Sequence, residues 1–475
     1  MNEEAPGTAM LHLHGEFPPT PTEAWEAAIT KDLKGAHFDK RLVWRPVEGL
    51  AIRPYYRRED LSPLGVQVTA APGEFPFVRG AAGGWQILEH WRPDGDAVRA
   101  DLWHDAGATA VQEVGFAIAA GVDRLAGVPD EGVSPEKAAR RLSFAFAIGS
   151  TYFLEIAKLR AARMLWAQAC SAFAVPADAA LMRIDACTAR ANKSVYDPHT
   201  NLLRVTTEAL SAVLGGCGRL FVEPFGFDRH LAINVHHILR DEAHLDAVAD
   251  AGGGAYYLEA LTDAVAREAW SVFQQIELEG GYDAATRAGT IERRIAEARA
   301  ATARAVSSRR RTLVGVNNYP NLTDREPARE PAALAGAQSS WRMAAPFEAI
   351  RRRTDVYVAR TGRRPMVALL RRGDPKMAGA RANFCLNLFG CAGFDIADGP
   401  EIDRNADLIV LCSADTEYTA MAADVVPHAG APVIVAGNPV AQRDELRELG
   451  VQGFVHLGSD AVETLAEWQN RLGID

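Results

Sequence analysis

Between residues 55 and 315, short apolar runs alternate with longer stretches of amphipathic periodicity. The short runs are "FVRG", "LSFAFAIGS", "LMRIDACTA" and "RLFVEPFG", and typical long stretches are "TNLLRVTTEALSAVLGG" and "LTDAVAREAWSVFQQIELEGG". Strand-like runs followed by helix-like stretches over about 260 residues are the rhythm of a parallel α/β barrel. The pattern therefore predicts a (β/α)8 TIM-type barrel over residues 51–322.

A second pattern occupies residues 362–475. The runs "MVALL", "DLIVLCS", "PVIVAG" and "GFVHLG" are short and almost entirely apolar, with helical or loop segments between them. Strands buried on both faces read this way in a doubly wound parallel sheet, so we predict a flavodoxin-like domain. The segment before it, 323–361, consists of a linker rich in proline, alanine and charge and a helix at 346–362.

The first 50 residues form a separate region. Their stretch "TEAWEAAITKDLKG" predicts a helix that Thr22 caps and Gly35 terminates. Trp25, Ile29 and Leu33 fall on one side of this helix, and the apolar-rich "LVWRPVEGLAI" follows it. The region is too small to build its own core, so we predict an arm, residues 1–50, that lies against another surface.

Composition narrows the function classes. A length of 475 residues suits two domains, and 48% hydrophobic with 24% charged residues is typical of a globular protein. The net charge of −10 argues against a nucleic-acid or anionic-membrane partner. The six cysteines are scattered without a CxxC pair, which favours reduced thiols over disulfides or a zinc site. With no signal-like pattern in "MNEEAPGTAM", we expect a cytoplasmic protein.

Several stretches, in order along the chain, carry a family resemblance. They are "DLKGAHFDKRLVWRPVEGLAIRPYYRREDL", "PGEFPFVRG", "FLEIAKLRAARMLWA", "DPHTNLLRVTTEALSAVLGG", "GAYYLEALTDAVAREAW" and "GVNNYPNL". Together they resemble the methylmalonyl-CoA mutase family, most closely the smaller subunit of its heterodimeric members. The resemblance implies an arm that wraps a partner subunit, a barrel that binds an acyl-CoA thioester, and a C-terminal sheet of the cobalamin-binding type.

The family's cobalamin signature is DxHxxG, then SxL, then GG, and here each part is half kept. In "DPKMAG" Asp374 and Gly379 remain, but Lys376 stands where the histidine would ligate cobalt. A lysine amine, with a reference pKa of about 10.4, is protonated at neutral pH and offers no lone pair to a metal. In the second part, "SAD", Ser413 remains and Asp415 stands where the signature has leucine. In the third part, within "VAGNP", Gly437 remains and Asn438 stands where the signature has its second glycine.

The resemblance with these changes implies that this chain binds no cofactor itself and that adenosylcobalamin resides in the partner subunit. Asp374 then reads as a turn residue and Gly379 as a helix-entry glycine. A modified mode of cobalamin binding, in which the cofactor keeps its own base, is the alternative.

The barrel signatures of active members are also altered. The "RxHCQTSG" stretch corresponds to "RIDACTAR", so Asp185 replaces the histidine that donates to the thioester carbonyl and Cys187 replaces the glutamine. A carboxylate there reverses the electrostatics at a developing oxyanion. The "TIRQYAG" stretch corresponds to "QILEHWR", in which Leu88 takes the arginine position and His90 the tyrosine position. Without the arginine, a carboxylate on the acyl group loses its bidentate clamp.

Two further groups of residues favour structural roles. His230, His237 and His244 recur at intervals of seven, which does not bring metal ligands together, so they predict a surface or interface stripe. Glu155, Lys158, Arg160 and Arg163 lie at ion-pair spacing on one helix and predict a structural network.

The sequence thus predicts a small, non-catalytic mutase subunit that forms a heterodimer with a homologous catalytic large subunit and stabilises it. One alternative is an active mutase that binds cobalamin and acyl-CoA itself at a modified site. Another is a barrel enzyme with new chemistry in which Asp185 acts as a general base near His90.

Overall fold

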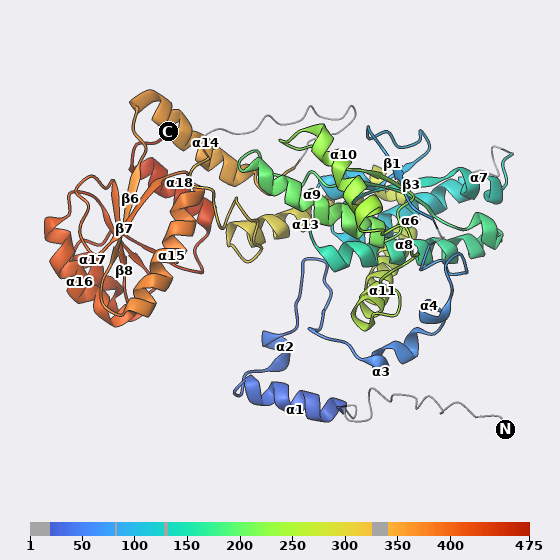
Figure 1. Ribbon diagram of the computed structural model, residues 1–475, viewed down its shortest axis with the longest axis horizontal. Helices are drawn as coiled ribbons and strands as arrows, with labels where there is room; N and C mark the ends of the chain where they lie inside the picture. The colour runs from blue at the N-terminus through green and yellow to red at the C-terminus, as the bar shows by residue number, and fades with distance from the viewer. Residues whose placement is uncertain (1–19, 81–82, 128–131, 325–340) are drawn as a thin grey trace, which may run out of the picture. The chain divides into compact units, whose positions relative to one another are not determined.

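The computed structural model describes residues 20–80, 83–127, 132–324 and 341–475 (Figure 1). By its internal contacts the chain divides into two compact units, residues 1–56 and residues 57–475. Both parallel sheets belong to the second unit.

The described part of the first unit contains two helices and one bridge. Helix α1 runs from Thr22 to Asp32, α2 from Phe38 to Arg41, and Trp44 pairs with Ile52 in an isolated antiparallel bridge. Thr22 is the first helical residue rather than the cap, and no residue of α1 is buried. This part of the unit therefore has almost no core of its own, as the sequence pattern predicted.

The first sheet is parallel, five-stranded and ordered β1-β5-β4-β3-β2. Its central strands β3 and β4 pair over six residues, from Ser143 with Arg183 to Ile148 with Thr188. All of β3 is buried because helices cover the sheet, and this explains its uninterrupted apolar sequence. The strands are β1 (Gln86–Ile87), β2 (Val98–Arg99), β3 (Ser143–Ile148), β4 (Arg183–Thr188) and β5 (Arg219–Phe221).

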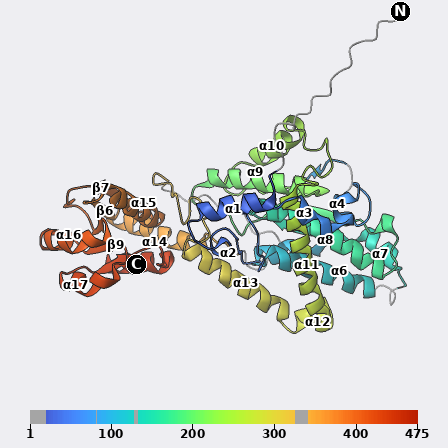
Figure 2. The ribbon, with the colours of Figure 1, turned by 90° about the horizontal axis from the view of Figure 1, so that it is seen from below.

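Three long helices, α6 (Ala110–Gly127), α8 (Tyr152–Ala172) and α11 (Tyr256–Leu278), pack against one another over the sheet (Figure 1, Figure 2). Two glycines of α6 allow the close approach. A Cβ on Gly121 would lie 2.6 Å from the Trp166 ring, and one on Gly115 would lie 2.7 Å from Val272. The remaining helices of this part are α3 (Arg58–Leu61), α4 (Val66–Thr69), α5 (Ala100–Asp105), α7 (Pro135–Arg141), α9 (Pro198–Leu214), α10 (Arg229–His237), α12 (Tyr282–Arg287) and α13 (Thr290–Ser307).

The expected eight-stranded closure of the barrel is not confirmed, because the described residues form five strands in this sheet. The run "FVRG" is a turn instead of a strand, since Phe77 and Gly80 both take positive φ values and Gly73 N–H donates to the Gly80 carbonyl at 2.6 Å. After β5, the described residues up to 324 form helices and turns, with a single bridge between Val314 and Asn318. The alternation of apolar runs and helices correctly predicted a parallel α/β fold, but it did not predict the number of strands in this sheet.

The second sheet confirms the doubly wound prediction in its topology. Its parallel strands are ordered β10-β9-β8-β6-β7, which is the flavodoxin-like order. The sequence pattern missed β7, because "DIADG" is a half-exposed edge strand without an apolar run. The strands are β6 (Met366–Arg371), β7 (Asp395–Gly399), β8 (Leu408–Cys412), β9 (Val433–Ala436) and β10 (Gly453–Val455).

Helices cover both faces of this sheet (Figure 1). Alternate residues of β6 belong to different cores: Val367 and Leu369 pack towards α15 and α18, whereas Ala368 and Leu370 pack towards α16 and α17. The helices are α14 (Ala345–Thr361), which leads into the sheet, α15 (Pro375–Cys391), α16 (Tyr418–Val425), α17 (Arg443–Glu448) and α18 (Ala461–Arg471). Most of the predicted linker, 325–340, lies outside the described residues.

Candidate functional site

The second sheet has a topological switch point between β6 and β8, where an open α/β sheet usually binds its ligand. Asp374 ends the loop after β6 and Lys376 lies at the start of the helix that follows it, while Ser413 and Asp415 directly follow β8. The fold therefore brings the first two parts of the altered cobalamin signature to one edge of the sheet.

Asp374 has a structural role at this edge. It is the N-cap of α15, and its carboxylate accepts a hydrogen bond from the Met377 N–H at 2.7 Å. Lys376 lies in the first turn of the helix and is exposed. Gly379 lies inside the helix, and a Cβ there would meet nothing within 4 Å. The geometry accounts for Asp374 without a ligand and gives no packing reason for Gly379.

The side chain of Glu417 lies between the two loops at the switch point. Its carboxylate accepts from the Asp374 N–H at 3.1 Å and from the Ala414 N–H at 3.2 Å. The Ser413 hydroxyl also donates to it, and this bond with the two backbone bonds lowers the pKa of the Glu417 carboxyl. A Cβ on Gly373 would clash with Glu417 and Ser413. Glu417 thus ties the two loops together where a ligand would have to enter.

The third part of the signature faces an ion pair. Arg381 on α15 donates to Asp415 at 3.1 Å, and a Cβ on Gly437 would lie 3.2 Å from the Asp415 carboxylate. Gly437 is buried, whereas Asn438 is exposed. Of the two altered residues in these parts of the signature, Asp415 lies beside Gly437 and Asn438 lies at the surface.

These residues do not fit a cobalamin bound through a protein ligand. The histidine position holds an exposed lysine, and beside it Glu417 accepts from the Asp374 N–H and Asp415 pairs with Arg381. Among the described residues no group of three or more histidine, cysteine, aspartate or glutamate side chains could hold a metal ion.

In the first sheet, Asp185 has a cationic partner that sequence reasoning did not find. It is buried on β4 and forms a two-pronged ion pair with Arg219 on β5, with Nε to carboxylate at 2.6 Å. Register places the two residues side by side in adjacent strands. A carboxylate held by a guanidinium is a poor general base, so the geometry argues against new chemistry at Asp185.

The pair borders a cavity of about 430 Å³ at the N-terminal ends of β4 and β5. Four arginines contribute to its wall, and each already has partners. Arg163, for example, donates to the Phe77, Val78 and Gly216 carbonyls. The others are Arg79, Arg183 and Arg219.

Leu88 and His90 do not converge with Asp185. Leu88 packs at the border of an apolar cluster on the inner face of the sheet, and His90 is exposed. The next residue, Trp91, is the one that enters this cluster, and it is only 6% exposed. Sequence reasoning missed Trp91 because it concentrated on the two aligned positions; a lone tryptophan beside them was the available signal.

The predicted network on α8 is confirmed and is larger than the sequence suggested. Lys158 lies 2.7 Å from the Glu113 carboxylate and 2.6 Å from that of Glu155. His104 approaches Glu113 at 3.0 Å, and although burial alone would lower the pKa of His104, Glu113 raises it above its usual value. Arg160 pairs with Glu259 at 2.7 Å.

The remaining sequence features have ordinary surroundings. All six cysteines are free and buried. His230, His237 and His244 are exposed, as expected of a surface stripe. None of the helices among the described residues is long and apolar enough to cross a membrane.

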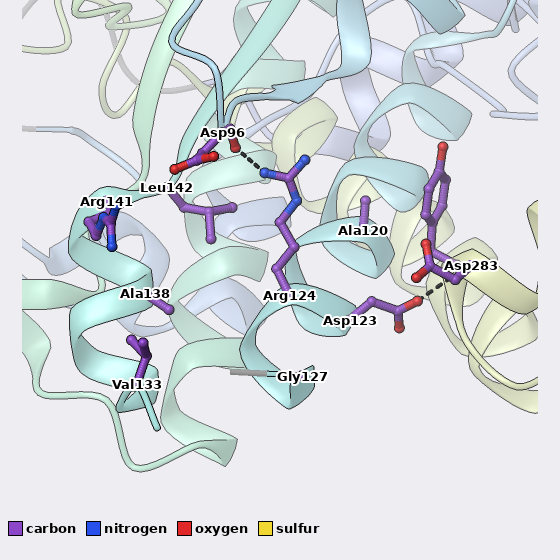
Figure 3. Close-up of a pocket in the computed structure, with 11 residues that line it drawn as sticks. Asp96, Ala120, Asp123, Arg124, Gly127, Val133, Ala138, Arg141, Leu142 and Asp283 are labelled. Atoms are coloured by element: carbon purple, nitrogen blue, oxygen red, sulfur yellow. Dashed lines mark hydrogen bonds between the residues drawn. The ribbon is translucent and has the colours of Figure 1, made fainter. Parts of the chain in front are cut away.

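A larger cavity, of about 550 Å³, lies near the end of α6 and contains none of the predicted site residues (Figure 3). Arg124 extends from α6 to donate to the Asp96 carbonyl, and Asp123 accepts from the Asp283 N–H at 2.8 Å. The charged side chains on its wall are of both signs, with two arginines and three aspartates, so the cavity indicates no ligand class.

The described residues define an α/β protein with two parallel sheets, and in the second sheet Glu417 joins the two loops at the switch point. The family model for methylmalonyl-CoA mutase matches residues 97–361. The chain belongs to the methylmalonyl-CoA mutase family.

The similar proteins include several described as small subunits. The methylmalonyl-CoA mutase small subunit of Porphyromonas gingivalis is 30% identical over 622 aligned positions that cover 97% of this chain and 99% of the relative. The small subunit of Streptomyces virginiae is 37% identical, and the probable small subunit of Mycobacterium tuberculosis is 33% identical. Each of these two matches covers 78% of this chain but only 63% of the relative's length.

Proposed function

We propose that this chain is the small, non-catalytic subunit of an adenosylcobalamin-dependent methylmalonyl-CoA mutase. In this proposal it pairs with a homologous large subunit as a heterodimer and stabilises that subunit. The large subunit binds the cofactor and interconverts methylmalonyl-CoA and succinyl-CoA. The small-subunit descriptions of the relatives support the pairing.

The observation that carries the non-catalytic assignment is the filled switch point. Glu417 bridges the loops after β6 and β8, and Lys376 stands exposed at the position of the cobalt ligand. On this view the second sheet is a degenerate domain of the cobalamin-binding type, and the first sheet corresponds to part of the family's acyl-CoA barrel. Buried free cysteines agree with a cytoplasmic complex.

We predict that the purified chain does not bind adenosylcobalamin through a protein ligand. Titration with the cofactor, followed by its visible spectrum, should leave the spectrum of the free cofactor unchanged. A family chain with an intact DxHxxG loop is the control for the titration. A stoichiometric base-off, ligand-bound spectrum would contradict the prediction.

We also predict that Lys376→His alone does not create cobalamin binding. The new imidazole would lie on the first turn of α15, but Glu417 and the Arg381–Asp415 pair would still occupy the crevice. The same spectral titration tests this variant. Tight binding by the single variant would show that these side chains move aside at little cost.

The pairing itself is tested by co-expression with a large subunit that has intact DxHxxG and HCQTSG stretches. We expect a 1:1 complex on sizing, and a mutase activity that survives heating better with this chain than without it. If the two chains elute separately, or the large subunit is equally stable alone, the proposed function is wrong.

A further inference from the structure

The order of strands in the first sheet points to a specific gap. In an eight-stranded barrel each strand neighbours the strands before and after it in sequence, and the first strand neighbours the last. Strands β2, β3, β4 and β5 follow this rule, and β1 lies beside β5, the last strand. Among these five strands, only β1 and β2 are consecutive in sequence without being neighbours in the sheet.

The connection between these two strands is short. Residues 88–97 join β1 to β2, whereas a crossover between adjacent parallel strands takes about a dozen residues or more. The family model begins to match at residue 97, at the end of this connection. The alignment with the Porphyromonas gingivalis relative has 622 positions for a chain of 475 residues, so the relative has at least 147 residues without a counterpart here.

We infer that the first sheet is a reduced barrel, in which the segment 88–97 replaces the strands that follow the first strand in the family, and that Trp91 of this segment fills the interior where an acyl thioester would lie. The inference rests on the proposed function for the choice of ligand. It deepens that proposal by naming the residue that closes the site.

Trp91 is held by a ring contact and by a hydrogen bond. The indole stacks on Phe221 of β5, with ring centroids 6.3 Å apart and an interplanar angle of 22°. Its N–H donates to the Asp101 carboxylate at 2.9 Å, and Arg99 of β2 donates to the same carboxylate through two nitrogens, at 2.8 and 2.7 Å. The ring thereby connects β5 to α5, the helix that directly follows the edge strand β2.

The strand residues around Trp91 are small. Ala145 and Ala147 of β3, Cys187 of β4 and Ala189 just after it are all buried in the same cluster. Small side chains on the inner face of a sheet leave a hollow unless something large fills it, because protein interiors are close-packed. A ligand on this face would have to occupy the volume that the indole ring takes.

The test removes the ring and returns it as a small molecule. In the full-length chain, Trp91→Gly should lower the midpoint of thermal unfolding by about 5–10 °C, since a buried indole is lost and a cavity remains. Saturating indole should restore part of this shift, and benzothiophene, which has a similar shape without an N–H donor, should restore less because Asp101 stays unpaired. Trp44→Gly, at a 48% exposed tryptophan, is the control and should show no response to indole.

Should Trp91→Gly fail to fold, Trp91→Phe provides the second test. It keeps an aromatic ring on Phe221 and loses the hydrogen bond, so the midpoint should fall by less than half of the roughly 5–10 °C expected for Trp91→Gly. A midpoint within 1 °C of the parent for Trp91→Gly, or an indole response equal to that of the control, would overturn the inference.

A binding measurement separates this inference from the proposed function. Equilibrium dialysis of the unaltered chain with methylmalonyl-CoA should show no stoichiometric binding. Stoichiometric binding would overturn the closed interior, while a 1:1 complex with the large subunit would still support the subunit role. Conversely, failure to form that complex would remove the subunit role and leave the tryptophan results standing.

Discussion

Replacing Lys158 by methionine is expected to lower the free energy of unfolding by about 3–5 kcal/mol, because removing one partner of a buried ion pair leaves the other uncompensated. The Lys158 ammonium is fully buried between Glu113 and Glu155, and it also donates to the Ala147 carbonyl at 2.5 Å. Burial alone would lower the pKa of Lys158, but the two carboxylates raise it above its usual value. Urea denaturation of the full chain measures the loss.

Two matched variants sharpen this test. Lys137→Met, at an exposed lysine on α7, should change stability by no more than about 0.5 kcal/mol. Combining Lys158→Met with Glu113→Gln should recover part of the loss, since one of the two buried charges is then removed. A loss below about 1 kcal/mol for Lys158→Met would mean that the network does not hold α6, α8 and β3 together.

The second large effect is expected in the arm. Replacing Trp25 and Trp44 together by alanine should weaken the complex with the large subunit by about 100-fold or more, as for two buried tryptophan anchors at an interface. The two side chains are 45% and 48% exposed, and no residue of α1 is buried. Such apolar surface on a unit with almost no core fits a segment that is buried by a partner.

Affinity can be measured by surface plasmon resonance on the separately purified subunits. Leu278→Ala, at an 89% exposed leucine of the second unit, is the control and should leave the affinity unchanged. Deleting residues 1–56 should weaken the complex at least as much while the unit 57–475 keeps its own unfolding transition. An unchanged affinity for both arm variants would refute the role of the arm.

Sequence reasoning was most successful where local pattern decides structure. The four apolar runs of the second sheet each became a strand, because a strand covered on both faces needs an unbroken apolar sequence. The half-exposed edge strand β7 has no such requirement, so it left no comparable signal. In the first sheet the helices were recognised by their periodicity, but strands of two residues, such as β1 and β2, are too short to show one.

The sequence by itself determined that this chain is an α/β protein of the mutase type with an altered cobalamin signature, since residue identities such as Lys376 and Asp185 are read directly from it. Tertiary structure decided which side chains surround these altered positions. Glu417 reaches Asp374 across 43 positions of sequence and Asp185 meets Arg219 across 34. Trp91 packs in one buried cluster with residues of β3, β4 and β5 because these three strands are neighbours in the sheet. Contacts of this kind depend on which strands become neighbours, and local sequence pattern does not encode strand order.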